Sequence, residues 1–384
     1  MSNKIKVASL FRSMQIWVSG WAWKVHATIW TILDQNDFRV SYIQLEDVKP
    51  RYEHQWDIIN LQKKFYLWFW LKKIVSWFKL ARIIKQYCNS NQTNIILWQW
   101  DFFFMITWLS KLLWNQAACI WIVHTTLRVR PKFIQNLLGR CLNKNDKVVC
   151  ISAQEKEYLA WNFWIKESNL TLIHNSISLE TIKKQSDEPL EAKEKLLFKK
   201  DIFTYISVWR YTYQKNFRLL IDSYKIVYEK NHKTQLIIIW DGEEYNNLSN
   251  YIIDLWLENH IKLLWKKNNP IQYMKYADCF VMSSRFEWYP MVLLEACACW
   301  LPLVSIDCPT WPAEVIWNNE WGILVKNHNN DKDIINASNL AWWMLKIVNS
   351  KREQIWKRNR NFVEQFDNKV IGEKWNDFLK TISH

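Results

Sequence analysis

Glycine is the residue that this sequence lacks most. It has 5 glycines and 28 tryptophans among 384 residues, although a chain of this length normally carries on the order of 27 glycines. Trp240 follows an apolar run in a turn context, and Trp300 stands between a helical pattern and Leu-Pro, where a helix usually ends on glycine. We hypothesise that most of the tryptophans are glycine in the working protein, read from UGA codons. The alternative is a tryptophan-rich protein with aromatic binding surfaces.

Long apolar runs and closely spaced cysteine pairs are also missing. No stretch of about 18 uncharged apolar residues occurs, which predicts that no helix spans a membrane. The 8 cysteines include no CxxC pair, so we expect buried thiols and no metal site. The first residues lack the layout of a signal peptide, which favours a cytoplasmic location.

Acidic residues are scarce beside basic ones: 51 Lys and Arg against 37 Asp and Glu give a net charge of +14. This excess predicts a polyanionic partner, either nucleic acid, anionic lipid or a phosphorylated substrate. The segment 63–85 is basic, with apolar residues at helical spacing. It favours either an anionic membrane surface or a core-facing helix with a solvated basic face. Because the sequence has no zinc spacing and no RNA-binding signature, we do not expect nucleic acid as the partner.

Short β-branched runs alternate with helix-length segments along the whole chain. The pattern is typical of parallel sheets built from βαβ units and predicts an α/β fold with two Rossmann-like doubly wound domains. A polar stretch at 180–200 is expected to be either the linker or the entry to the second domain. We predict a first domain at 1–190, a second at 191–365, and a C-terminal helix at 366–384 that crosses back to the first domain. The expected strands are 5–10, 38–43, 94–97, 119–123, 148–152, 170–173, 203–208, 236–239, 261–264, 279–282, 303–306 and 323–325.

The most informative stretch runs from Ser283 to Pro302, after the predicted strand 279–282. Pro290 suits the first turn of a helix, whose N-terminus presents N–H groups and the positive end of the helix dipole. Glu287 precedes this helix and Glu295 lies within it. The arrangement predicts a diphosphate site, which glycine at position 288 would open and an indole would fill.

This stretch resembles the E-x7-E region of family-4 retaining glycosyltransferases, with Glu287 and Glu295 as the two glutamates. The resemblance implies the GT-B fold, in which two domains face a cleft, and a reaction that needs no bound metal. It implies that Glu287 is catalytic and contacts the donor sugar, and that Glu295 contacts the ribose hydroxyls. It also assigns the residues that follow Glu287 to donor binding: Trp288, Tyr289, Pro290, Met291 and Val292.

A second segment, from Ile206 to Asn216, resembles the family's G-R…K-(N/G) segment when position 209 is read as glycine. The resemblance implies that Arg210 and Lys215 clamp the donor diphosphate. Arginine offers a planar fork of donors and lysine a compact charge, and both neutralise a leaving nucleotide.

Two features of the first half resemble the family more loosely. With glycine at 21 and 23, the segment from Val18 to Val25 resembles the Gly-rich loop at the cleft, although it lacks the acidic residue common at position 23. This likeness places Gly20 and Trp21 in the cleft loop. His124 ends a predicted strand, where family members often carry a histidine that approaches the transferred sugar. The alternatives are a plain helix-starting loop and a structural histidine.

The resemblance predicts an enzyme of the hexosyltransferase type. It would move a hexose or N-acetylhexosamine with retention from a nucleotide-sugar, with UDP as the expected nucleotide, to a glycan acceptor. Segment 63–85 adds the hypothesis of a lipid-linked oligosaccharide acceptor and a peripheral position at the cytosolic membrane face. The nucleotide-sugar is a substrate, and no cofactor is expected. The alternatives are a UDP-sugar epimerase of the same fold, or an inactive or nucleic-acid-binding basic protein.

Overall fold

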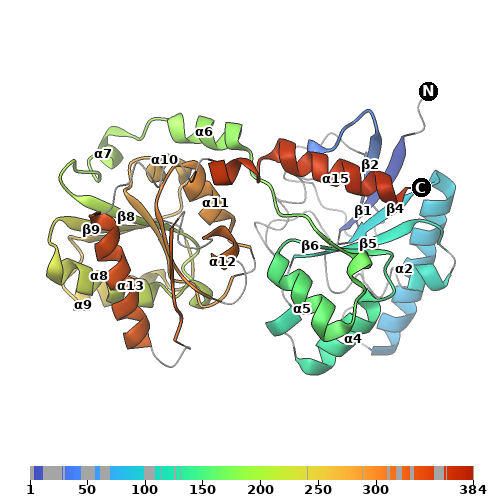
Figure 1. Ribbon diagram of the computed structural model, residues 1–384, viewed down its shortest axis with the longest axis horizontal. Helices are drawn as coiled ribbons and strands as arrows, with labels where there is room; N and C mark the ends of the chain where they lie inside the picture. The colour runs from blue at the N-terminus through green and yellow to red at the C-terminus, as the bar shows by residue number, and fades with distance from the viewer. Residues whose placement is uncertain are drawn as a thin grey trace. The chain divides into compact units, whose positions relative to one another are not determined.

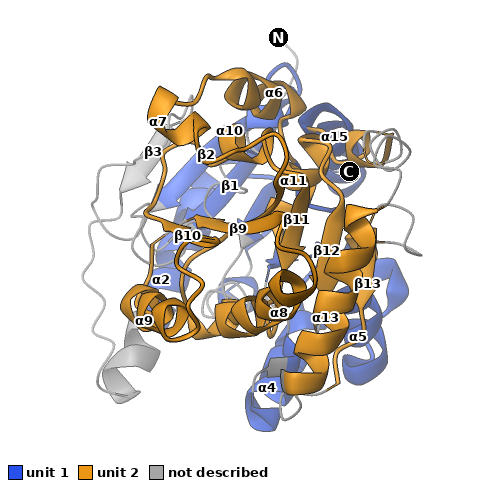
Figure 2. Ribbon diagram, turned by 90° about the vertical axis from the view of Figure 1, so that its left-hand side faces the viewer, with its two compact units in different colours: residues 1–176, 368–384 blue, residues 177–367 orange. Residues whose placement is uncertain are grey.

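Two parallel sheets, each with helices packed on its faces, make up the computed structural model of the chain (Figure 1). Each sheet is the centre of one unit (Figure 2). Unit 1 contains residues 1–176 and 368–384, and unit 2 contains residues 177–367. The structure describes residues 4–11, 28, 31–44, 57–60, 70–98, 109–113, 115–124, 127–129, 131–239, 241–287, 289–308, 312–316, 322–328, 333–349, 359 and 361–383.

Unit 1 is built on a seven-stranded parallel sheet in the order β3-β2-β1-β4-β5-β6-β7. The strands are apolar on both faces because helices cover both, and residues such as Val7, Ile96 and Ile120 have almost no exposed surface. Its strands are β1 (Ile5–Phe11), β2 (Phe38–Gln44), β3 (Asp57–Asn60), β4 (Ile95–Trp98), β5 (Ala118–Val123), β6 (Lys147–Cys150) and β7 (Leu170–Leu172).

Unit 2 is built on a six-stranded parallel sheet in the order β10-β9-β8-β11-β12-β13. Every residue of β8 and β9 is buried, so these strands form the middle of the unit's core. Its strands are β8 (Phe203–Val208), β9 (Thr234–Ile239), β10 (Ile261–Leu264), β11 (Cys279–Met282), β12 (Leu303–Ile306) and β13 (Gly322–Val325).

Helices connect the strands and cover the sheets (Figure 1). In unit 1 they are α2 (Trp70–Asn91), α4 (Lys132–Leu142), α5 (Ala153–Phe163) and α15 (Asn368–Ile382), with short 3-10 turns η1 (Leu127–Val129) and η2 (Glu167–Asn169). In unit 2 they are α6 (Leu179–Asp187), α7 (Ala192–Lys195), α8 (Phe217–Lys230), α9 (Tyr245–Asp254), α10 (Ile271–Met274), α11 (Met291–Ala298), α12 (Pro312–Val315) and α13 (Asp333–Val348), with the 3-10 turn η3 (Tyr213–Lys215).

The predicted fold class, two Rossmann-like doubly wound α/β domains, is confirmed. The strands β8, β10, β11 and β12 have the predicted bounds, and the other predicted strands differ by at most two residues at either end. The sequence prediction missed β3, which has 4 residues and begins on an aspartate. A strand this short leaves little period-2 signal to detect.

The chain enters unit 2 at Ile177 and leaves it at Asp367, whereas the domain limits expected from composition are 190 and 365. Helix α6 packs against α10 and α11 of unit 2. Ile177 also bridges to Asp367, and the N–H of Leu179 donates to Asp367 Oδ2 at 3.1 Å. The polar stretch expected to be the linker or the entry to the second domain therefore forms α6 and α7 at the start of unit 2.

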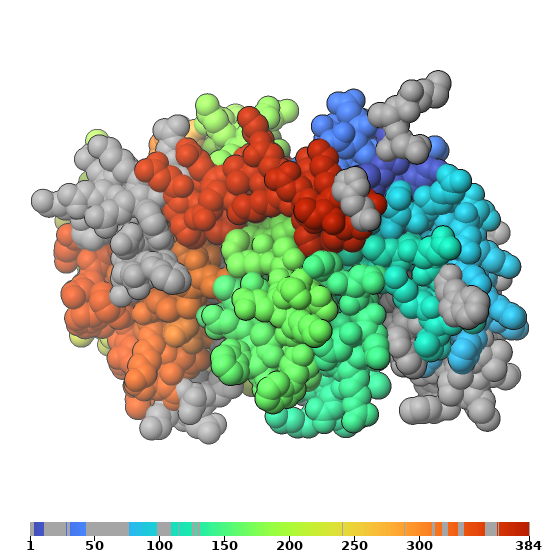
Figure 3. Space-filling view, turned by 45° about the vertical axis from the view of Figure 1, so that its right-hand side comes forward, coloured from blue at the N-terminus to red at the C-terminus, as the bar shows by residue number. Residues whose placement is uncertain are grey.

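The last helix, α15, completes unit 1. Asn376 Oδ1 accepts from the N–H of Asp34 at 3.2 Å, and Lys380 Nζ lies 2.6 Å from Asp37 Oδ2. A Cβ atom at Gly372 would lie 2.9 Å from the carbonyl oxygen of Ile32, so the helix approaches as closely as glycine permits. Figure 3 shows these C-terminal residues, in red, against the blue and green segments of the same unit.

The basic segment 63–85 is described only from residue 70, where α2 begins. Leu80, Ala81 and Ile84 of this helix are buried in the hydrophobic core of unit 1, while Lys79 and Arg82 are exposed. Over residues 77–85 the helix thus faces the core on one side and carries exposed basic residues on the other. Among the helices of the described ranges, none is long and apolar enough to cross a membrane.

Candidate active site

The candidate site of unit 2 lies at the carboxyl ends of β8 and β11. These strands are neighbours in the sheet, although β9 and β10 come between them in the sequence. The winding of the sheet therefore reverses between them. In open α/β sheets, ligands bind at this switch point, outside the carboxyl ends of the strands. The segments that follow β8 and β11 carry Lys215 and Glu287, respectively.

Lys215 and Glu287 form a buried ion pair. Lys215 Nζ lies 2.7 Å from Oε1 and 2.9 Å from Oε2 of Glu287, and both side chains are almost inaccessible to solvent. Removing two charges from water is costly unless close geometry and further hydrogen bonds compensate. A charged pair held at a switch point is accordingly a candidate for chemistry.

Hydrogen bonds between the two segments fix the pair. Ser283 Oγ donates to the carbonyl oxygen of Lys215 at 3.0 Å, and the N–H of Arg285 donates to the carbonyl oxygen of Gln214 at 2.8 Å. Gln214 Nε2 reaches Glu287 Oε2 at 3.4 Å. These bonds join residues about 70 positions apart in the chain, so the site depends on the whole β8–β11 arrangement.

Sequence reasoning gave no role to two further residues of this site. The hydroxyl of Ser284 donates to Glu287 Oε1. Asn216 has left-handed backbone (φ 50°, ψ 47°), and its Oδ1 accepts from Arg285 Nη2 at 3.0 Å. Asparagine tolerates this conformation better than most residues, and a serine directly after a buried strand is a weak polar signal. Neither feature reveals its partner before the fold is known.

Burial sets the electrostatics of the pair. It lowers the pKa of Lys215, because the ammonium loses water, while the charge of Glu287 and its hydrogen bond act in the opposite direction. The positive charge of Arg210 lowers the pKa of Lys215 further. Burial raises the pKa of the Cys308 thiol well above its usual range, and the charge of Glu287 adds to that shift. An anionic ligand near Lys215 would therefore favour its charged form.

Helix α11 begins beside this pair. Pro290 stands at its N-cap, and Met291 and Val292 are buried in its first turn. Tyr289 is buried just before the helix, and Glu295 is buried in its second turn. The predicted donor-binding residues of this stretch thus lie on one strand–loop–helix unit. Trp288 lies outside the described residues.

Position 209 and Arg210 follow β8 directly. The Arg210 side chain is exposed, so it can meet a ligand from solvent. The indole ring of Trp209 lies over Lys215, with Nζ 3.3 Å from the ring centroid. At this distance the ring shields the ammonium on one side. Arg210 and Lys215, which are predicted to clamp the diphosphate, thus both follow β8, and an indole ring covers one side of Lys215.

His124 belongs to unit 1, where it directly follows β5. It is buried, and burial lowers its pKa to about 4, so the ring is neutral at physiological pH. Its Nε2 has no hydrogen-bond partner among the described residues. The predicted cleft-loop residues Gly20 and Trp21 lie outside the described part of the chain.

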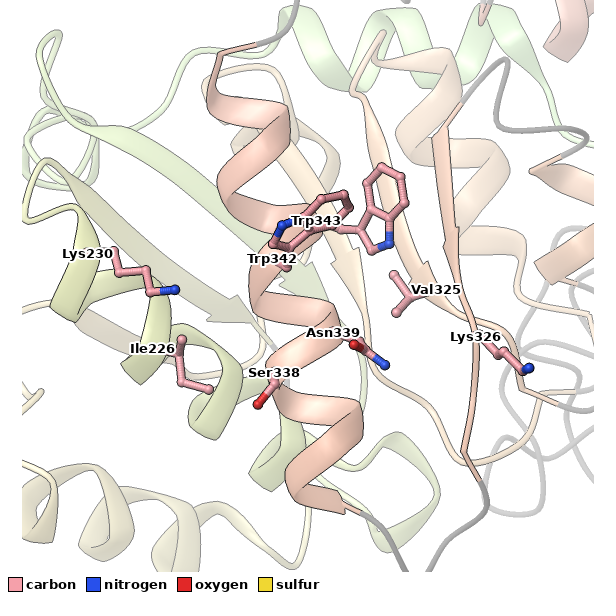
Figure 4. A pocket seen from close by; sticks show the side chains of 8 residues that line it. All are labelled: Ile226, Lys230, Val325, Lys326, Ser338, Asn339, Trp342 and Trp343. Atoms are coloured by element: carbon pink, nitrogen blue, oxygen red, sulfur yellow. The ribbon is translucent and has the colours of Figure 1, made fainter.

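A groove of about 620 Å³ opens elsewhere on unit 2, between α8, β13 and α13 (Figure 4). Its lining contains none of the residues of the Lys215–Glu287 site. It has no carboxylate or histidine that could act as a proton donor or acceptor near neutral pH. It is lined by Ile226, Lys230, Val325, Lys326, Ser338, Asn339, Trp342 and Trp343.

The site can bind an anion and position a hydroxyl-rich ligand. Lys215 and Arg210 supply positive charge, the start of α11 supplies the positive end of a helix dipole, and the glutamates accept hydrogen bonds from hydroxyl groups. In the described ranges, no three histidine, cysteine or acidic side chains converge as metal ligands would.

Comparison with known families agrees with this chemistry. Residues 190–361 match the family described as glycosyl transferases group 1, and residues 32–181 match glycosyltransferase family 4. The chain is similar to an uncharacterized glycosyltransferase of Methanocaldococcus jannaschii, with 28% identity over 333 residues, 79% of this chain and 80% of the relative.

Two further relatives extend the comparison. One is the UDP-Gal:alpha-D-GlcNAc-diphosphoundecaprenol alpha-1,3-galactosyltransferase of Escherichia coli, 27% identical over 253 residues, 61% of each chain. The other is the crystal structure of Anabaena HepE in complex with UDP and glucose, which superposes with a TM-score of 0.75 at 15% identity and covers 98% of this chain and 100% of that one. The structural likeness shows the GT-B fold, and the family matches span both sheets. The protein therefore belongs to the group 1, family-4 glycosyltransferases and is a glycosyltransferase.

Proposed function

We propose that this enzyme transfers a hexose or N-acetylhexosamine, with retention of configuration, from a UDP-sugar to a glycan acceptor. The observation that carries the proposal is the buried Lys215–Glu287 pair at the β8–β11 switch point, with the exposed Arg210 beside it. Two similar proteins support the donor: the Escherichia coli relative is a UDP-Gal enzyme, and HepE crystallised with UDP and glucose.

In the proposed reaction, Arg210 and Lys215 neutralise the diphosphate as its bond to the sugar breaks. Glu287 holds the sugar hydroxyls, and Glu295 accepts hydrogen bonds from the ribose. The acceptor hydroxyl attacks the anomeric carbon from the face that the diphosphate leaves, and its proton passes to the departing phosphate oxygen. Same-face attack retains configuration without a covalent enzyme intermediate.

The proposed acceptor is a lipid-linked oligosaccharide at the cytosolic face of a membrane. The Escherichia coli relative acts on a diphosphoundecaprenol-linked sugar, and the outer face of α2 carries exposed Lys79 and Arg82. Because the apolar face of this helix is buried in unit 1, contact with anionic lipid would be electrostatic and peripheral, without insertion of the helix.

The test is thermal unfolding with UDP, GDP and ADP, on the unchanged chain and on Trp209→Gly/Trp288→Gly, in which neither indole can fill the site. A nucleotide at 100 times its dissociation constant adds about 2.7 kcal/mol to the free energy of unfolding. We expect UDP to stabilise best, Arg210→Ala to lose most of the effect, and Arg140→Ala, an exposed arginine of α4 in unit 1, to keep it. Absence of stabilisation by any nucleotide in either chain would contradict the donor assignment. Interconversion of UDP-sugars without acceptor would favour the epimerase instead.

A further inference from the structure

Five residues other than glycine have left-handed backbone in the described part of the chain, and three of them are tryptophan. Trp164, Trp256 and Trp300 have φ of 55°, 60° and 64°. The other two are Gln92 and Asn216. Left-handed backbone is strained for residues with a bulky side chain and is the ordinary conformation of glycine.

Each of these tryptophans stands at the end of a helix, where glycine is the usual residue. Trp256 and Trp300 follow the C-cap residues of α9 and α11. The N–H of Trp256 donates to the carbonyl three residues back at 2.9 Å, and that of Leu257 to the carbonyl five residues back at 3.1 Å. Trp300 and Leu301 repeat the pattern at 2.9 and 3.0 Å. These paired bonds, with a buried leucine following, define the Schellman helix end, where the left-handed residue is usually glycine. Trp164 is the left-handed C-cap of α5.

The indole rings at these positions gain little from packing. The exposed fractions are 87% for Trp164, 85% for Trp256 and 52% for Trp300. A tryptophan normally offsets its ordering cost by burying its large apolar surface. Trp375 in α15 does so, with 1% exposed and its ring against Phe378. The strained backbone and the exposed ring therefore coincide at the same three residues.

We propose that the protein made in its native cell carries glycine at positions 164, 256 and 300, and also at 209, because the cell reads UGA as glycine, whereas Trp375 is a true tryptophan. At 209 the inference rests on the proposed function: the Trp209 ring lies 3.3 Å from Lys215 Nζ, the place that a donor diphosphate needs. Glycine there removes the ring and opens the ammonium to an anionic ligand.

The direct test is to sequence the gene and to measure the peptide masses of the protein from its native cell. We expect UGA codons at 164, 209, 256 and 300 and a UGG codon at 375, and glycine masses at the four positions in peptides from the native cell. UGG codons or tryptophan masses at 164, 256 and 300 would overturn the proposal. If only 209 proved to be tryptophan, the helix-end assignments would stand and the open donor site would not.

Unfolding of recombinant variants tests the structural basis independently. Trp164→Gly, Trp256→Gly and Trp300→Gly should each raise the Tm by roughly 2–4 °C, because each relieves a strained backbone. The matched control is Trp161→Gly, which lies inside α5, three residues before the C-cap Trp164, and is 82% exposed. Glycine is unfavourable inside a helix, so this change should lower the Tm. A Tm that does not rise for the three helix-end variants would contradict the proposal.

Nucleotide binding separates this inference from the proposed function. Stabilisation by UDP in Trp209→Gly/Trp288→Gly but not in Trp288→Gly alone supports both. Equal stabilisation in the two chains overturns the assignment of glycine at 209 and leaves the donor assignment intact. No stabilisation in either chain contradicts the donor assignment, while the rise in Tm at the helix ends still supports glycine at 164, 256 and 300.

Discussion

The two units have the same strand order around their switch points, but residues of different chemical type follow their strands. Both sheets place the first strand of the unit beside the fourth, so both have a switch point. In unit 2 the segments that follow the central strands meet in a buried charged pair, Lys215 and Glu287. In unit 1 the described strand ends include a buried, neutral imidazole, His124. The topology thus determines where a ligand can bind, and the residues after the strands determine which charge it meets.

The largest expected effect comes from breaking the charged pair. Lys215→Ala should lower the free energy of unfolding by about 3–5 kcal/mol, because Glu287 would remain buried without its partner. Lys225→Ala, which removes an exposed pair with Glu229 at 3.9 Å, should cost no more than about 0.5 kcal/mol. Urea unfolding of both variants measures the difference. Similar small losses would mean that the pair contributes little to unit 2.

Lowering the pH should reduce the free energy of unfolding because of the buried neutral His124 in unit 1. The pKa of His124 is about 4 in the fold and about 6.5 in an unfolded chain. Between these values the unfolded chain binds the extra proton, so stability falls as the pH drops from about 6.5 to about 4. The loss should reach about 3 kcal/mol. His124→Gln should abolish this component, whereas His328→Gln in unit 2 should retain it. A wild-type unfolding energy that stays constant over this range would contradict the burial argument.

Glu287 and Glu295 of the candidate site should bind different parts of the donor, and Glu295 should bind the ribose. In the Trp209→Gly/Trp288→Gly chain, Glu295→Ala should weaken UDP binding by about 1.5–3 kcal/mol, the range for hydrogen bonds to a charged group. This variant should bind 2′,3′-dideoxy-UDP as well as the same chain with Glu295 does, because that nucleotide lacks the ribose hydroxyls. Calorimetric titration of both nucleotides gives the comparison. An equal loss for the two would assign Glu295 a structural role.

The smallest effect concerns the basic face of unit 1. Lys79→Ala and Arg82→Ala should each weaken binding to anionic vesicles by about 1 kcal/mol at low salt. Lys199→Ala, an exposed lysine of unit 2, serves as the control and should leave vesicle binding unchanged. Co-sedimentation at two salt concentrations measures the effect. A protein that stays in the supernatant with all vesicles would point to an acceptor free of the membrane.

Most strands could be predicted because a parallel strand covered on both faces is an unbroken apolar run. The resemblance to the family's motifs pointed to Lys215 and Glu287, which lie in the segments that follow β8 and β11. The contacts that hold them could not be predicted: Gln214 and Ser283 form hydrogen bonds with residues about 70 positions away. The start of unit 2 at Ile177 could not be predicted from the sequence either, because it depends on the packing of α6 against α10 and α11.

The placement of α15 has a consequence for synthesis. Unit 2 is one uninterrupted stretch of chain, whereas unit 1 needs residues from both ends. Domains begin to fold as they emerge from the ribosome, N-terminal parts first. The first unit to be translated is thus the last to be completed, because Ile32 remains uncovered until Gly372 has been made. A premature stop before residue 368 should spare the second unit and destabilise the first, which limited proteolysis of the truncated chain would reveal.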